Sequence, residues 1–199
     1  MKKINITFFI SFLLGFIISG KSQSLRYQND SNLSSFGIGI LQKNKISFKG
    51  EVYLDSNFQK TYADDILIGE SITPLLYKPD YGICFFICFK CTKTYFIIKN
   101  NNGINIYIKK TDAFTFFMWE DFLCNQVIGI STKEPSKNPP RYNINGKVIN
   151  IEFWDNDDEQ DILEIKGDWI KIKNINQKVI YWIKWKEGNM LLVYLNMLI

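Results

Sequence analysis

The chain has 199 residues and a formal net charge of +4, and it contains no histidine. Without histidine it cannot build a Ser-His-Asp or Cys-His catalytic centre, and the commonest general base is missing. Phenylalanine, tyrosine and tryptophan make up 16% of the residues, and such side chains fit pleated, half-buried surfaces. The composition therefore favours an all-β protein that is not an enzyme, and no glycine-rich phosphate loop or other cofactor motif is present.

Residues 1–22 are typical of an export signal peptide. The positive start Lys2-Lys3 precedes an apolar run over residues 4–18, and Ser22 and Ser24 fit a cleavage site equally well. An uncleaved membrane anchor is the alternative, but the run is short for a span of about 20 residues. We therefore expect a secreted or periplasmic protein with no membrane span after cleavage.

Removal of the signal lowers the formal net charge from +4 to +1, because Lys2, Lys3 and Lys21 leave with it. The remaining basic residues are interspersed with acidic ones along the chain. This balance gives no reason to expect a nucleic-acid partner.

The first half of the mature chain divides into an N-terminal extension, residues 23–70, and a first module, residues 71–130. Residues 38–54 of the extension carry short alternating stretches that predict two edge strands. Within the module, residues 83–89 form a continuous apolar run with the length of a strand buried on both faces.

A hairpin and a short helix follow that run. Asn100-Asn101-Asn102-Gly103 separates two strand-like stretches, residues 95–99 and 104–109, and Asn and Gly tolerate the positive φ that a hairpin turn requires. Residues 118–124 lie in an aromatic-rich stretch and predict a short helix that packs against the core.

Residues 131–143 are predicted to be a linker, because prolines at positions 135, 139 and 140 favour extended, solvated backbone. A second module, residues 144–199, follows it. Its apolar stretches predict five strands, at residues 148–154, 162–166, 169–173, 179–184 and 190–195. The acidic run at residues 155–161 only loosely matches a calcium loop, so a solvated loop is favoured.

An internal repeat relates the two modules. Residues 94–99 match residues 168–173 at an offset of 74, and residues 107–110 match residues 182–185 at an offset of 75. One inserted turn residue brings both matches into register. The spacing indicates two copies of one supersecondary unit, with chance similarity of two hairpins as the alternative.

The segments Gly167-Asp168-Trp169-Ile170-Lys171-Ile172 and Trp182-Ile183-Lys184-Trp185 resemble the bacterial SH3-like (SH3b) domain, whose second aromatic usually follows a glycine. Here Tyr181 stands in place of that glycine, and Ile106 does so in the first copy. The mature chain is also similar to exported proteins of Bacteroidetes-type bacteria whose function is unknown. The resemblance implies two small SH3-like barrels, each a binding module for peptides or cell-wall components.

Aromatic side chains are the candidate ligand-binding residues, because aromatic faces suit sugars and proline-rich peptides. These candidates are Trp169, Tyr181, Trp182, Trp185, Tyr95 and Tyr107. Trp169 is out of phase with the inward isoleucines and caps the core or grips a ligand. We expect an exported, non-catalytic module that binds a cell-wall glycan or peptide. The alternative is a structural component of the envelope that binds a protein partner.

The four cysteines favour a disulfide in an exported protein. Cys84 and Cys88 lie about 13 Å apart along the predicted strand, which is too far for a bond. Cys91 lies at the strand end, from which it can reach Cys124, so Cys91–Cys124 is the candidate disulfide. Other pairings and four reduced thiols stay open, and a metal site is not expected.

Overall fold

The structure, a computed structural model, describes residues 36–44, 49–66, 72–150 and 159–197. These residues form 16 strands and one α-helix, so the expected all-β class is confirmed. The export signal, residues 46–48 of the extension and residues 151–154 of an expected strand lie outside the described residues. No helix in the described part is both long and apolar enough to cross a membrane.

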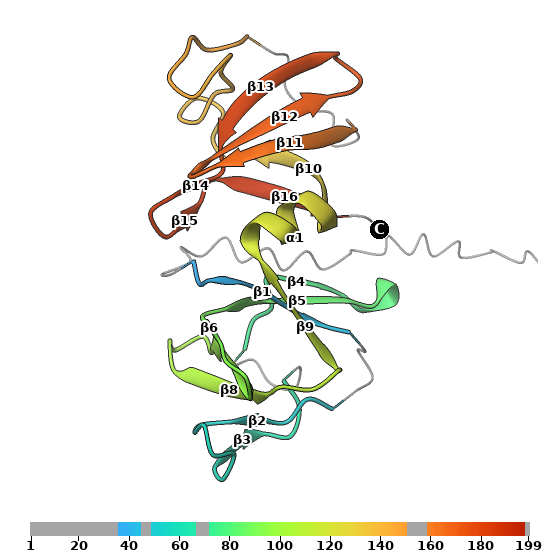
Figure 1. Ribbon diagram of the computed structural model, residues 1–199, viewed down its shortest axis with the longest axis vertical. Helices are drawn as coiled ribbons and strands as arrows, with labels where there is room; N and C mark the ends of the chain where they lie inside the picture. The colour runs from blue at the N-terminus through green and yellow to red at the C-terminus, as the bar shows by residue number, and fades with distance from the viewer. Residues whose placement is uncertain (1–35, 45–48, 67–71, 151–158, 198–199) are drawn as a thin grey trace, which may run out of the picture.

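The first sheet lies at the centre of the molecule and is buried on both faces (Figure 1). It contains β4 (Leu76–Lys78), β5 (Ile83–Cys88), β1 (Gly39–Lys43) and β9 (Phe114–Met118) in that order, and all neighbours are antiparallel. Successive side chains of a strand point to opposite faces. The apolar run of β5 therefore supplies both cores, as the sequence predicts.

A second sheet covers one face of the first sheet. Its order is β3 (Thr61–Ala63), β2 (Val52–Tyr53), β8 (Asn105–Lys109), β7 (Tyr95–Lys99) and β6 (Lys90–Cys91). The β7–β8 hairpin forms where the sequence predicts it. The core between the two sheets is called the first core. It contains Leu41, Val52, Ile66, Cys84, Phe86, Phe96, Ile98, Ile106, Ile108 and Phe114, among others.

The C-terminal half contains the remaining strands. β11 (Gln160–Lys166), β12 (Trp169–Asn174) and β13 (Val179–Lys184) form a three-stranded sheet. β10 (Val127–Thr132) pairs with β16 (Val193–Met197), and β14 (Lys186–Glu187) pairs with β15 (Met190–Leu191). The strand predicted at residues 190–195 is thus divided between β15 and β16.

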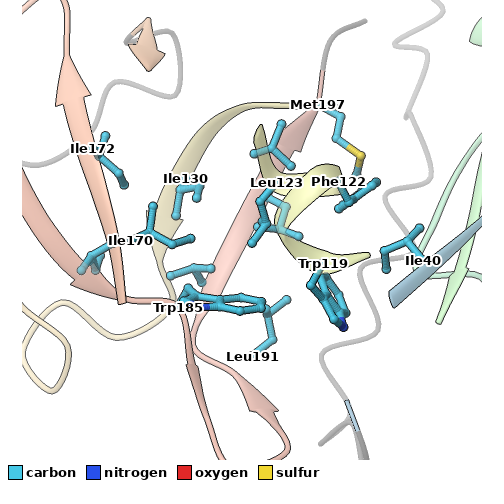
Figure 2. Packing of buried hydrophobic residues seen from close by; sticks show 14 of the residues in the cluster. Ile40, Trp119, Phe122, Leu123, Ile130, Ile170, Ile172, Trp185, Leu191 and Met197 are labelled. Carbon is cyan, nitrogen blue, oxygen red and sulfur yellow. The ribbon is translucent and has the colours of Figure 1, made fainter. Parts of the chain in front are cut away.

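The helix α1 (Trp119–Gln126) lies between the two halves, and its N-terminal part coincides with the predicted helix (Figure 1). Its buried side chains belong to a second core, which is distinct from the first core between the two sheets. This second core also contains Ile40 from β1 and Ile170 from β12 (Figure 2). Phe122 is fully buried there, and its ring lies 5.1 Å from that of Phe85 on β5. One core thus joins sheets from both halves.

Phe36 packs between the aromatic rings of the two halves. Its ring stacks on Trp119 at 4.2 Å between centroids and meets Trp185 edge-on at 4.9 Å. The indole N–H of Trp119 donates to the Phe36 carbonyl at 3.1 Å. Phe36 therefore links α1 to Trp185, the residue that follows β13.

The strand pairing crosses the domain boundaries that the sequence predicts. β1 and β2 belong to the predicted N-terminal extension, yet each lies inside a sheet, so neither is an edge strand. The predicted linker is not uniformly solvated either, because Asn138 and Pro140 are buried. Asn138 is held by hydrogen bonds to the backbone of Lys184.

The two halves repeat one register at their central hairpins. Tyr95 faces Lys109 in the first hairpin, and Trp169 faces Lys184 in the second. Hydrogen bonds of 2.9 Å close both hairpins at equivalent positions, from Lys110 N–H to the Thr94 carbonyl and from Trp185 N–H to the Asp168 carbonyl. The inward residues also correspond. They are Phe96, Ile98, Ile106 and Ile108 in the first half, and Ile170, Ile172, Tyr181 and Ile183 in the second.

The repeat extends beyond the hairpins. β1 pairs antiparallel with β9, and β10 pairs in the same way with β16. Tyr53 bridges Tyr107 and Thr61, and Arg141 likewise bridges Trp182 and Val148. The halves therefore share these pairings, although the sheets of the first half contain more strands. No sheet closes on itself within the described residues, so the two SH3-like barrels stay a prediction.

Each hairpin turn begins with a buried asparagine. The side-chain oxygen of Asn100 accepts from the N–H groups of Asn102 and Ile104, and that of Asn174 accepts from Gln177. Asn100 is 5% exposed and Asn174 is 2% exposed. Because an asparagine side chain can satisfy the turn's backbone donors, the same residue type serves both turns.

Replacing Phe122 by alanine should lower the free energy of unfolding by about 3–5 kcal/mol, since it leaves a cavity where α1 meets both halves. The change should appear as one cooperative transition in urea. Leu163→Ala, at a side chain that is 46% exposed, should change stability by less than about 0.5 kcal/mol. A loss below about 1 kcal/mol for Phe122→Ala, or two separate transitions, would contradict the shared core.

Candidate ligand-binding face

The outer face of the second sheet carries a row of tyrosines. Because Ile106 and Ile108 point into the core, Tyr107 between them points outward, and Tyr95 and Tyr53 lie on the same face. The rings of Tyr95 and Tyr107 meet edge-on with centroids 5.4 Å apart. All three tyrosines are half-buried. Together with Phe58 they are referred to below as the aromatic face.

Phe58 is held in an unusual backbone conformation beside this row. Its φ is 59°, a left-handed value that is rare for a bulky side chain. Its ring lies 5.2 Å from that of Tyr53, edge-on. Strained residues of this kind persist where the surrounding structure fixes them, and they concentrate at ligand-contacting sites.

The carboxylate of Asp55 fixes the loop that carries Phe58. It accepts hydrogen bonds from the backbone N–H groups of Lys60 at 2.7 Å, Asn57 at 2.8 Å and Gln59 at 3.4 Å. These bonds, with that from Lys60 the strongest influence, hold the pKa of Asp55 below its ordinary value of 3.8. The carboxylate therefore stays charged at neutral pH and retains these hydrogen bonds to the loop backbone. The loop is called closed when these bonds are formed.

A cleft of about 480 Å³ opens next to Tyr53. Its volume lies in the range of roughly 300–1,000 Å³ typical of small-molecule sites. The Tyr53 hydroxyl donates to the carboxylate of Glu51, and this hydrogen bond is the main cause that raises the pKa of Tyr53. The cleft is lined by Lys49, Gly50, Glu51, Tyr53, Asp64, Lys109, Thr111 and Phe114.

The equivalent face of the second half is more covered. Trp169 is half-buried there, in the position of Tyr95, and Trp182 is only 8% exposed in the position of Tyr107. The Lys171 ammonium lies 5.7 Å from the centre of the Trp182 ring. Arg141 pairs with the Trp182 backbone, so the predicted linker runs along β13 at this point.

The predicted aromatic surface is wrong for three of its six members. Tyr181 and Trp185 are 1% and 2% exposed and belong to the second core, and Trp182 is nearly as buried. Tyr181 points inward because it alternates with Trp182 along β13, and the Trp185 indole donates to the Gly167 carbonyl. Tyr95, Tyr107 and Trp169 do lie half-buried on outer faces.

Sequence reasoning missed Tyr53 and Phe58. The sequence predicts an edge strand around Tyr53, and only the pairing of Tyr53 with Tyr107, 54 positions later in the chain, places it in the row. Nothing in the local sequence around Phe58 marks its left-handed backbone. The one available signal for Phe58 is that a bulky hydrophobic residue stands between polar neighbours in a turn.

All four cysteines are free thiols, so the expected Cys91–Cys124 disulfide is absent. Burial raises the pKa of the Cys84 and Cys88 thiols to about 12. Cys91 is half-buried on β6, and Cys124 is exposed on α1. The described residues contain no cluster of three or more cysteine, aspartate or glutamate side chains suited to a metal ion.

Comparison of the chain with protein-family models, with curated proteins and with solved structures finds no match.

Native protein treated with iodoacetamide at mildly alkaline pH should be labelled at Cys91 and Cys124 and spared at Cys84 and Cys88. The thiolate is the reactive form, and burial both blocks access to the two strand cysteines and suppresses their ionisation. Peptide mass spectrometry reads the pattern. Equal labelling of all four after unfolding is the control, and native labelling of Cys84 would show that the first core is open.

The loop carrying Phe58 should stay closed as pH falls to 3.8 and open only below that value. The folded-state pKa of Asp55 is depressed, so its contribution is present above the unfolded pKa and is lost as pH falls through the folded pKa. Amide NMR shifts of Lys60 and Asn57 report the opening. Asp55→Asn should remove the titration, and a midpoint at or above 3.8 would contradict the role of the carboxylate.

Proposed function

We propose that the protein is an exported, non-catalytic binding module for a glycan or peptide of the cell envelope, and that the aromatic face is its binding site. The observation that supports this most directly is the row of half-buried tyrosines with Phe58 held beside it. Rigid aromatic side chains offer a large contact area at a low entropy cost on binding.

The position of the row also supports binding through side chains. β2, β8 and β7 are interior strands of their sheet, so their backbone groups are engaged in the ladders on either side. A ligand on this face meets rings and polar side-chain ends. The first half is the better site, because Tyr95 and Tyr107 are both half-buried there, whereas Trp182, at the position of Tyr107 in the second half, is only 8% exposed.

The strand order favours the SH3-like proposal for each half. In the first half β6, β7 and β8 form a meander, and the terminal strands β1 and β9 pair with each other. The second half repeats this with β11, β12 and β13, and with β10 and β16. Small binding modules of this class place their ligands on aromatic surfaces, which agrees with the proposed site.

The alternative is a structural role in the envelope through a protein partner. Large apolar side chains are exposed in the second half, where Tyr142 is 65% exposed, Val148 is 52% exposed and Ile180 is 48% exposed. Such side chains suit a protein contact when they form a continuous patch.

Purified mature protein should be retained on insoluble peptidoglycan, and Tyr107→Ala should weaken retention by about tenfold, as expected for the loss of a stacked aromatic contact. Tyr142→Ala is the matched control, because it removes a more exposed tyrosine outside the aromatic face. If Trp169→Ala abolished retention and Tyr107→Ala did not, the binding site would lie in the second half. No retention by folded wild type would reject the envelope polymer and favour a protein partner.

A further inference from the structure

The cleft beside Tyr53 lies at a place where the two halves of the repeat differ in their side chains. Counting back three residues from the paired positions Tyr53 and Arg141 equates Gly50 with Asn138. In the second half the Asn138 side chain donates to the Lys184 carbonyl at 2.7 Å and accepts from its N–H. Gly50 has no side chain to reach Lys109, the counterpart of Lys184, and the cleft opens at this place.

The cleft is polar at its rim and aromatic at its walls. Lys49 and Lys109 provide hydrogen-bond donors, and the carboxylates of Glu51 and Asp64 provide acceptors. All four side chains are exposed at the rim, whereas Phe114 is buried beneath them. The two positive and two negative groups balance, so the cleft has no net charge with which to select an ionic ligand.

Resting on the proposed function, we propose that this cleft is a saccharide subsite that binds a neutral, hydroxyl-rich sugar ring of a linear glycan. Each sugar hydroxyl is both a donor and an acceptor, which matches a rim of mixed ammonium, carboxylate and hydroxyl groups. The apolar face of a sugar ring matches the Tyr53 ring. Because Tyr53 belongs to both the cleft and the aromatic face, one glycan chain can continue from the cleft over Tyr107 and Tyr95.

The same geometry disfavours an extended peptide. A peptide that adds to a sheet needs an unpaired strand edge, whereas Tyr53 and Tyr107 lie on interior strands already paired on both sides. A ligand at this place gains its hydrogen bonds from side chains. The closely spaced donors and acceptors of a sugar ring meet that requirement more fully than a peptide backbone does.

Competition on insoluble peptidoglycan separates the two ligand classes. Peptide-free glycan strands should displace the bound mature protein, and glycan-free stem peptides should not. Displacement by stem peptides alone would overturn the saccharide subsite while leaving the proposed binding function intact. If the protein were not retained on peptidoglycan and peptide-free glycan gave no calorimetric binding, both the saccharide subsite and the proposed binding function would be overturned.

Two rim variants test the cleft itself. Asp64→Asn and Lys109→Gln should each weaken calorimetric binding of peptide-free glycan strands by about tenfold, the effect expected from losing a hydrogen bond to a charged group. Asp161→Asn and Lys173→Gln make the same chemical changes at an exposed pair in the second half and should leave the affinity unchanged. Wild-type affinity in both rim variants, with circular dichroism unchanged, would refute the subsite.

Discussion

The burial of the central sheet on both faces is the constraint on which the rest of the structure depends. Leu41 and Ile40 are neighbours on β1, and both are fully buried in different cores. Two layers must therefore cover the sheet, one from the first half and one through α1 from the second. Since apolar burial is the main favourable term in folding, the halves are stabilised together and the aromatic face rests on a rigid support.

The sequence predicts local elements well here and their partners poorly. The β7–β8 and β12–β13 hairpins follow from alternation and turn residues, which act over a few positions. The place of β1 between β5 and β9 depends on contacts across long stretches of chain, and no local pattern encodes it. The predicted domain boundaries rest on the same kind of local signal, since prolines at positions 135, 139 and 140 mark extended backbone without showing what it packs against.

The candidate site shows why binding residues are hard to predict from sequence: the sequence does not say whether an aromatic side chain of a strand points to the core or to the outer face. Trp182 and Tyr107 occupy equivalent hairpin positions and each pairs with a neighbouring segment, yet Trp182 is 8% exposed and Tyr107 is half-buried. The aromatic character of Tyr181 predicts ligand binding, but its position in the alternation of β13 directs its side chain into the core. Aromatic residues in strands serve both purposes, and only the packing around them separates the two.

The β1–β9 pairing passes close to the backbone at Gly39, and this close approach bears on how the repeated halves avoid exchanging strands. Because β1 pairs with β9 as β10 pairs with β16, β1 has two similar potential partners, β9 and β16, and swapped pairing is a characteristic failure of repeated folds. A side chain at Gly39 would come within 2.1 Å of the Phe117 carbonyl, whereas β10 has a register shift between Val127 and Gly129. The two pairings therefore differ in shape, and this difference favours the correct assembly during folding.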